Sequence, residues 1–283
     1  EPLGSGNFGK AYLAEDSRAR NRKCVVKKFD FSNSNQAAFN KAKELFEREA
    51  EFLYKLSNSD QNHYIPQFFA SFDEGQEFYL VEEWIQGQTL GEELQQKHRL
   101  TEDEIVDLLN EVLEILKFIH SQGVIHRDIK PENLMRRNQN DRIVLIDFGA
   151  VKEMVAQSTN IAPSIKMTMI YTEGYAPPEQ RQGMPQYNSD IYALGMTALE
   201  LLTGLEPENL KNRKTGEIIW PSTLQISAEL INILEKMVDE KYNRRYQTAE
   251  DVLKQLNQKT VIVSPKYVPN HRSSPTILGK TFI

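Results

Sequence analysis

The chain has 283 residues, with 34 Lys and Arg against 40 Asp and Glu, so its net charge is −6 with neutral histidines. With 40% hydrophobic and 26% charged residues, it has enough apolar material for a substantial core, which excludes a mainly disordered chain. The acidic balance argues against nucleic acid as a partner, and no apolar run is long enough to span a bilayer.

A glycine-rich segment opens the chain with the spacing G-x-G-x-x-G. Its residues are Gly4, Ser5, Gly6, Asn7, Phe8 and Gly9. Glycines let backbone amides approach phosphate oxygens closely, because no Cβ intervenes. Taken alone, the spacing equally fits a flexible turn. The next residues, 10–14, are strand-like and not helical, which predicts a hairpin and not a dinucleotide-binding turn.

Three strands are predicted in the following region, over 24–29, 67–72 and 78–83. The first contains Lys27 and Lys28, and one of two adjacent strand residues must face inward. Either both lysines reach solvent at a sheet edge, or the inward one has an anionic partner. The only cysteine, Cys24, lies on the same strand and cannot form an internal disulfide. A reducing, cytoplasmic compartment is therefore expected.

A helix between the first two strands contains Glu49 in the middle of its apolar stripe. The stripe consists of Ala42, Leu45, Phe46, Phe52, Leu53 and Leu56. A buried carboxylate needs a cationic partner, and Lys27 is the natural candidate. The alternative is a stripe that tolerates one glutamate.

Two further helices are predicted. Thr101 and Glu104 form a capping box before an amphipathic helix over 101–121. The segment 190–203 is apolar on more than one side, which predicts a deeply buried helix. A small mixed first part, to about Gly87, and a larger helical second part predict an α+β protein.

The segment most informative about chemistry runs from His126 to Asn133, directly after the first of these helices. Nineteen residues beyond Asp128, an apolar strand leads into Asp147-Phe148-Gly149. Asp128, Asn133 and Asp147 are oxygen-bearing side chains at the ends of regular elements. Such groups suit Mg²⁺ and can accept a proton from a hydroxyl.

At these positions the chain resembles the eukaryotic-type serine/threonine protein kinases, in particular bacterial, cyanobacterial-like members. The resemblance covers about 3–256 and includes the glycine loop, the strand lysine, the HRD-x-K-x-x-N loop, DFG and a degenerate APE at Pro177. It implies a two-lobed fold, with a small antiparallel-sheet N-lobe carrying one helix and a larger, mainly helical C-lobe. The expected kinase domain is 1–258, with lobes meeting near 87 and the start of the first strand missing. Residues 259–283 would be a linker or tail.

The resemblance also implies that ATP and Mg²⁺ are the cofactors. The expected nucleotide-binding residues are Gly4, Ser5, Gly6, Asn7, Phe8, Gly9, Lys27, Glu83, Ile85, Asn133 and Asp147. Among them, Glu83 and Ile85 would bind adenine through their backbone, and Asn133 and Asp147 would bind the metal.

The catalytic set implied by the resemblance is Asp128, Lys130, Lys27 and Glu49. Asp128 would accept the proton of the substrate hydroxyl, Lys130 would contact the γ-phosphate, and Lys27 would hold the α- and β-phosphates and pair with Glu49. The implied activity is phosphorylation of Ser or Thr in protein substrates, with autophosphorylation.

Other positions resemble structural and regulatory residues of the family. Glu179 and Arg245 resemble its buried ion pair, and Asp190 resembles the aspartate that anchors the catalytic loop. Thr168 is the expected activation-segment phosphosite, because Thr172 aligns with the threonine that contacts the catalytic aspartate and lysine.

Three departures from the family pattern are Glu82 at the gatekeeper position, Tyr171 before Thr172, and Pro177 in place of alanine. A charge at the Glu82 position needs a partner or water. A nucleotide-binding pseudokinase scaffold is the alternative function. A small-molecule kinase fits less well, because such enzymes lack the complete form of the loop at 126–133 and a segment like 172–179 of this chain.

Overall fold

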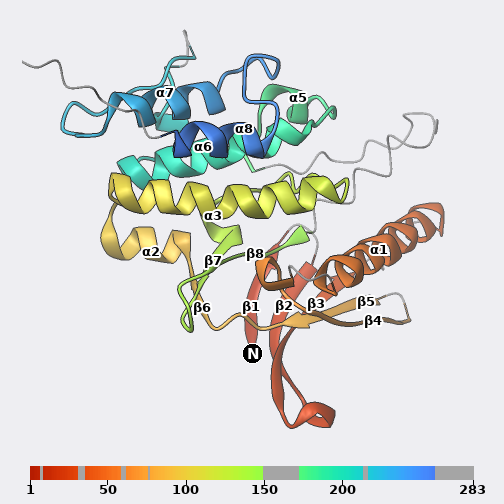
Figure 1. The fold of residues 1–283 in the computed structure, drawn as a ribbon. Coiled ribbons are helices and arrows are strands. Elements are labelled where there is room, and N and C mark those ends of the chain that lie inside the picture. Colours follow the sequence, from red (N-terminus) through yellow and green to blue (C-terminus); the bar gives the residue numbers. More distant parts are fainter. Residues whose placement is uncertain are drawn as a thin grey trace, which may run out of the picture.

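The computed structural model describes residues 1–6, 9–30, 36–58, 62–75, 77–148, 172–212 and 216–258. Two parts are visible in Figure 1: a twisted sheet with one long helix beside it, and a larger group of helices. The predicted α+β arrangement, with a small antiparallel sheet first and a mainly helical region after it, is confirmed.

The first part is an antiparallel five-stranded sheet with the strand order β1-β2-β3-β5-β4. Its strands are β1 (Pro2–Gly6), β2 (Gly9–Asp16), β3 (Arg22–Asp30), β4 (Phe68–Glu74) and β5 (Glu77–Glu83). The three strands predicted from apolar content are confirmed within two residues at each end, and the predicted hairpin is β1–β2. At Gly9, φ is 146° and a Cβ would lie 1.9 Å from the Lys28 carbonyl oxygen, so only glycine fits there.

The long helix α1 (Gln36–Ser57) packs against this sheet through aromatic side chains. The ring of Phe46 lies 5.1 Å from that of Phe78 in β5 and 5.6 Å from that of Phe29 in β3. Since these contacts are between side chains, apolar burial holds the helix to the sheet.

A second, three-stranded sheet lies between the two parts in Figure 1. It is formed by β6 (Gly87–Thr89), β7 (Leu134–Arg137) and β8 (Ile143–Leu145). Short 3₁₀ turns lie at Ser17–Ala19, Asn62–Tyr64, Pro131–Asn133 and Pro207–Asn209.

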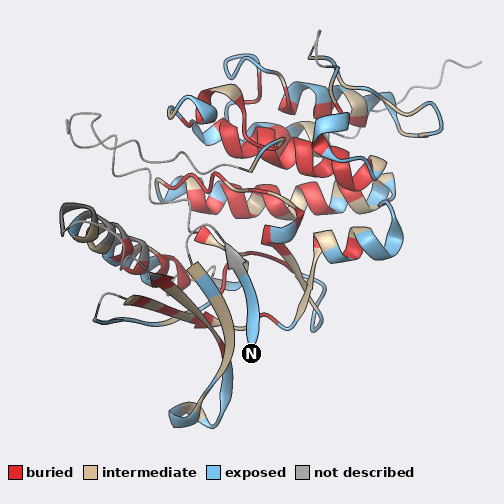
Figure 2. Cartoon of the chain, turned by 180° about the vertical axis from the view of Figure 1, so that it is seen from behind, coloured by how far each residue is buried: buried red, intermediate tan, exposed pale blue. Residues whose placement is uncertain are grey.

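The helical part is built around α6. Its helices are α2 (Leu90–Lys97), α3 (Glu102–Ser121), α5 (Pro178–Arg181), α6 (Tyr187–Thr203), α7 (Ala228–Met237) and α8 (Ala249–Asn257). Figure 2 shows α3 and α6 as the most buried of them, and every residue of α6 from 188 to 202 is buried. The capping box of Thr101 and Glu104 at the start of α3 is confirmed.

The predicted start of α6 at Asp190 is wrong by three residues, because the helix begins at Tyr187. The polar residues Asn188 and Ser189 hide this start in the sequence. In the fold both are buried with partners: Asn188 donates to the Tyr242 carbonyl, and the Ser189 hydroxyl donates to a carboxylate. Within the residues described, no helix combines the length and apolar character needed to cross a bilayer.

Candidate active site

The loop between α3 and β7 is anchored by the side chain of Asp190 in α6. The buried carboxylate of Asp190 accepts hydrogen bonds from the amides of His126 (2.9 Å) and Arg127 (2.8 Å) and lies 2.9 Å from Nε2 of His120. Burial opposes ionisation of this carboxyl, but the hydrogen bond and charge of His120 lead the causes that outweigh it and lower the pKa of Asp190. The anchoring role expected for Asp190 is confirmed.

His126 connects the same loop to the segment that follows β8. Its ring is fully buried, lies 3.2 Å from the Ile146 carbonyl through Nε2, and meets the Phe148 ring edge-on at 4.8 Å. Burial is the main cause that lowers the pKa of His126, so the ring is neutral at pH 7. A neutral, enclosed ring supports the strand that leads to Asp147 and does not reach a substrate.

The carboxylate of Asp128 is surrounded by hydrogen-bond donors. Oδ1 accepts from the Thr172 hydroxyl at 2.7 Å, and Oδ2 accepts from Nδ2 of Asn133 at 2.8 Å and lies 3.0 Å from Nζ of Lys130. Nζ of Lys130 also donates to the Thr172 hydroxyl at 2.8 Å. The predicted contact of Thr172 with both residues is confirmed, and its hydroxyl links them.

Lys27 lies between two carboxylates from different parts of the chain. Its Nζ is 2.9 Å from Oε1 of Glu82 in β5 and 3.6 Å from Oδ1 of Asp147, which follows β8. Asp147 has φ of 63°, a conformation that non-glycine residues adopt rarely and that is common at active sites. The inward-facing alternative for the strand lysines is therefore correct, since Lys27 has anionic partners.

Sequence reasoning missed the contact between Lys27 and Glu82. The signal was present, because β3 and β5 run antiparallel with Lys27 opposite Leu80, and Glu82 is two residues further on the same face. Strand alternation predicts that Lys27 and Glu82 share a face only when the register of β3 and β5 is known. The register depends on the whole sheet, so the two sequence segments alone did not reveal it.

Several of the expected site residues cannot be placed with their side chains. Glu49 lies within α1, but its side chain is outside the description, so its expected pairing with Lys27 stays a prediction. Asn7, Phe8, Thr168 and Tyr171 are outside the described residues. The glycines flanking Asn7 and Phe8 form the facing ends of the β1–β2 hairpin, where Gly6 is opposite Gly9.

The end of β5 and the residues that follow it join the two parts of the chain. The side chain of Glu83 forms a two-point contact with Arg137 of β7, at 2.6 and 3.0 Å, and its amide donates to the Gln67 carbonyl at 2.8 Å. Ile85 is buried, and among the hydrogen bonds of the described residues none uses its amide N–H.

The described residues contain no group of three or more His, Cys, Asp or Glu placed to hold a metal ion. The candidate donors are the carboxylate of Asp147 and the amide oxygen of Asn133. Nδ2 of Asn133 is engaged by Asp128, at 2.7 Å to its carbonyl and 2.8 Å to its carboxylate, so the oxygen faces the other way. Mg²⁺ in phosphoryl-transfer sites takes one or two protein ligands and fills its shell with phosphate and water, which this sparse set fits.

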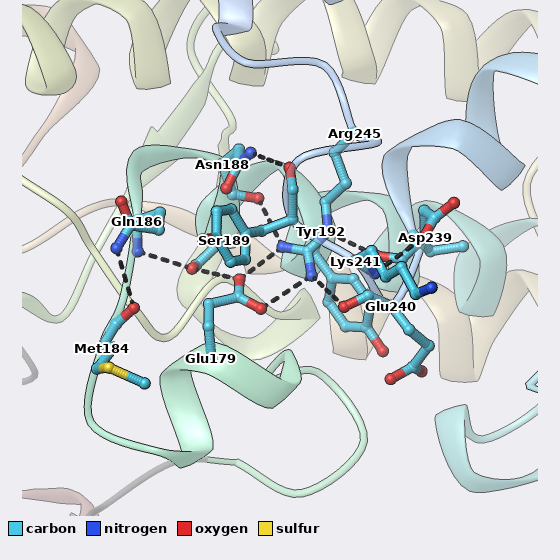
Figure 3. Close-up of polar contacts among 12 residues, drawn as sticks. Glu179, Met184, Gln186, Asn188, Ser189, Tyr192, Asp239, Glu240, Lys241 and Arg245 are labelled. Carbon is cyan, nitrogen blue, oxygen red and sulfur yellow. Dashed lines mark hydrogen bonds and ion pairs between the residues drawn. The ribbon is translucent and has the colours of Figure 1, made fainter.

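A buried ion pair fixes the segment that follows Thr172. The guanidinium of Arg245 contacts the Glu179 carboxylate through Nη1 (2.6 Å) and Nη2 (3.0 Å), and Ser189 donates to the same carboxylate at 2.7 Å (Figure 3). The remaining N–H groups of Arg245 donate to the carbonyls of residues 188, 239 and 240. All five donors are thus satisfied. The expected buried pair is confirmed.

Comparison with known proteins gives a consistent family. A sequence profile described as "Protein kinase domain" matches residues 1–258. Serine/threonine-protein kinase PknA of Nostoc sp. is 40% identical over 271 residues, covering 94% of this chain and 48% of the relative. Serine/threonine-protein kinases B and F of Synechocystis sp. are 39% and 42% identical, covering 91% and 90% of this chain and 46% and 53% of the relatives. The chain spans about half the length of these curated relatives, and the resemblance to cyanobacterial kinases is confirmed.

Proposed function

The chain belongs to the protein kinase domain family, and we propose that it transfers the γ-phosphoryl group of Mg·ATP to serine or threonine hydroxyls of proteins, including its own. The observation that carries this proposal is the Asp128 carboxylate, held by Thr172, Asn133 and Lys130. Phosphoryl transfer to a hydroxyl needs an oriented proton acceptor and nearby positive charge. The names of the relatives, serine/threonine-protein kinases, support the same class of acceptor.

The nucleotide is assigned to the expected binding residues. In support, Lys27 and Asp147 lie 3.6 Å apart although one belongs to the sheet and the other follows β8. Adenine would bond to the amide of Ile85 and the carbonyl of Glu83, and the hairpin glycines would cover the phosphates. The expected pairing of Glu49 with Lys27 belongs to the same proposal.

Asn133 and Asp147 would hold the metal. Bound Mg²⁺ supplies charge neutralisation on the phosphate oxygens. The chain's own contribution is position, because the Asn133 amide is fixed by Asp128 and Asp147 is held near the Lys27 ammonium.

Asp128 orients the acceptor hydroxyl and takes its proton. The hydroxyl oxygen forms the new bond to the γ-phosphorus while the bond to the β-phosphate oxygen breaks, so phosphorylated product and ADP leave and the proton stays on Asp128 until it passes to solvent. Lys130, at 3.0 Å from Asp128, places a positive charge beside the transferred group.

We also infer that residues 1–258 form one kinase domain with lobes divided near residue 87, followed by a linker or tail. Proteins with exposed Ser or Thr are the expected partners, and the net charge of −6 gives no general attraction to nucleic acid. The cytoplasm is the proposed compartment, because Cys24 is a buried free thiol, as is usual where thiols stay reduced.

The test is transfer of labelled γ-phosphate from Mg·ATP to the chain itself and to a basic model protein. We expect label on Ser or Thr, a loss of about 10² to 10⁴-fold in the Asp128→Asn variant, and loss in Asp147→Ala. Wild-type protein that binds ATP with Mg²⁺ but transfers no phosphate would favour the pseudokinase scaffold instead. Mapping the label would also test Thr168.

A further inference from the structure

Glu82 and Lys27 are diagonal neighbours on one face of the sheet. In the β3–β5 ladder Lys27 lies opposite Leu80, and Glu82 follows two residues later on β5. Diagonal pairs on a sheet face are within reach of long side chains, and here Nζ and Oε1 are 2.9 Å apart. The pair is therefore a product of the sheet register.

The surroundings of the pair make each charge depend on the other. Glu82 is 6% exposed, and the Lys27 side chain is 18% exposed. A charge with so little access to water is costly without a partner, and removing one member of a buried pair leaves the other uncompensated. Lys27 is consequently held at Glu82 even without nucleotide, with Asp147 at 3.6 Å on the same ammonium.

The β5 position gives this carboxylate a fixed place. Backbone hydrogen bonds join β5 to β3 from Cys24–Glu83 to Asp30–Glu77 and join it to β4 on its other edge. The helix α1, in contrast, meets the sheet through side-chain packing such as Phe46 on Phe78. The ladder therefore fixes the backbone of Glu82 relative to that of Lys27, whereas the position of a carboxylate on α1 depends on how that helix packs on the sheet.

We propose that Glu82 is a positioning residue of the nucleotide site, which holds the Lys27 ammonium from within the sheet and keeps it ready for the phosphates wherever α1 lies. The inference rests on the proposed function in one respect, namely that Lys27 contacts the phosphates of ATP. An ammonium is a three-donor group, so contact with a carboxylate and contact with phosphate oxygens are compatible at Lys27.

The same strand pair offers a matched control. Glu77 of β5 pairs with Lys28 of β3 at 2.6 Å, again diagonally across the ladder but on the opposite face. Its partner's side chain is 30% exposed, so this pair is nearer to water. Glu77→Gln removes the same charge from the same strand without touching Lys27.

The test compares Glu82→Gln with Glu77→Gln in the whole chain. The dissociation constant of a non-hydrolysable ATP analogue with Mg²⁺ is measured by calorimetry, together with KM for ATP and kcat. We expect Glu82→Gln to weaken analogue binding and raise KM about tenfold, Glu82→Asp to recover part of the loss, and Glu77→Gln to stay within about twofold of wild type. Analogue binding by Glu82→Gln that equals or exceeds wild type would overturn the proposal.

Folding of the variants is followed in the absence of nucleotide. Were Glu82→Gln to unfold, the double variant Glu82→Leu with Lys27→Met decides, because replacing both members of a buried pair by apolar groups is tolerated far better than replacing one. Recovered folding of the double variant supports the pairing of Glu82 with Lys27. A double variant that also fails to fold overturns the proposal. Analogue binding is measured separately from transfer, so a wild-type chain that transfers no phosphate would end the proposed function while leaving this inference testable.

Discussion

The hydroxyl of Thr172 is the link between the catalytic loop and the segment before α5. It donates to Asp128 at 2.7 Å and accepts from Lys130 at 2.8 Å, although it lies 44 residues beyond the aspartate. One small group therefore sets the direction of the carboxylate and of the ammonium together.

The Thr172→Val variant keeps the shape of this side chain and removes its hydroxyl. We expect kcat to fall about ten- to hundredfold, because Asp128 and Lys130 lose their shared partner and a lost buried hydrogen bond costs about 1–3 kcal/mol. Steady-state phosphorylation assays measure the effect. Thr172→Ser restores the hydroxyl and should recover most of kcat, and equal rates for all three proteins would contradict the assignment.

The contacts of single residues could be predicted where a local sequence motif identifies them. They could not be predicted where the partners come from segments far apart in the sequence. The contact of Thr172 with Asp128 followed from resemblance. The partner of Lys27 did not, because only the β3–β5 register shows that Glu82 shares its face. Glu49 was favoured because its helical stripe is visible in the sequence itself.

At the scale of elements, the start of α3 carries a pH-dependent contribution. The hydrogen bond from Lys97, followed by that from the Thr101 amide, lowers the pKa of Glu104 from 4.5 to about 2. A lowered folded-state pKa means that the stabilisation is present above pH 4.5 and is lost as pH falls toward 2. Because the side chain is 40% exposed, we discount the effect to about 1 kcal/mol.

The Glu104→Gln variant should remove this acid-side loss. Urea unfolding at several pH values between 5 and 2 should show a flatter profile than wild type. Lys97→Met removes the largest cause of the shift and should flatten the profile in part. Profiles parallel to wild type in both variants would refute this account of the cap.

The contact between Glu83 and Arg137 ties β5 of the sheet to β7 of the second sheet. Two-point carboxylate–guanidinium contacts are among the stronger ion pairs, yet these side chains are 29% and 19% exposed. We expect Arg137→Gln to lower the free energy of unfolding by about 1 kcal/mol, with the difference shrinking at high salt. Denaturant unfolding at 50 mM and 1 M salt tests it, with Lys254→Gln on the exposed face of α8 as the control. A loss independent of salt would assign the effect to packing.

Element boundaries followed from sequence where periodicity and caps agree. The α3 helix has both a capping box and an apolar stripe, and its predicted limits are confirmed. The start of α6 was predicted late because Asn188 and Ser189 are polar, and their buried partners lie in other elements. From sequence alone a polar residue is predicted to be exposed, because the partner that allows its burial is known only from the fold.

At the scale of the whole molecule, α6 is the common support of the site. Asp190 holds the catalytic loop, Ser189 bonds to the Glu179 carboxylate of α5, and Glu200 accepts a hydrogen bond from Tyr175, near Thr172. Three site-forming segments are thus fixed to one buried helix. The packing of α6 therefore bears on all three of these segments.

The stability of the molecule should consequently respond to the charge of Glu200. Burial is the main cause that raises its pKa from 4.5 to about 7, the Tyr175 hydroxyl opposes the rise, and the charges of Glu132 and Glu206 add to it. A raised folded-state pKa means that stability is fully present below pH 4.5 and is lost as pH rises through 7. The shift from 4.5 to about 7 corresponds to about 3 kcal/mol between these limits.

The Glu200→Gln variant keeps an acceptor for Tyr175 and cannot ionise. We expect its stability relative to wild type to be higher at pH 8 than at pH 5 by up to about 3 kcal/mol, because wild type alone must ionise a buried carboxyl. Urea unfolding at the two pH values measures the difference. Glu206→Gln removes only an exposed neighbouring charge and so lowers the pKa of Glu200. Its stability relative to wild type should also be higher at pH 8 than at pH 5, but by less than for Glu200→Gln. A Glu200→Gln profile parallel to wild type would show that the carboxyl reaches water in the folded chain, and that α6 is less sealed than its burial indicates.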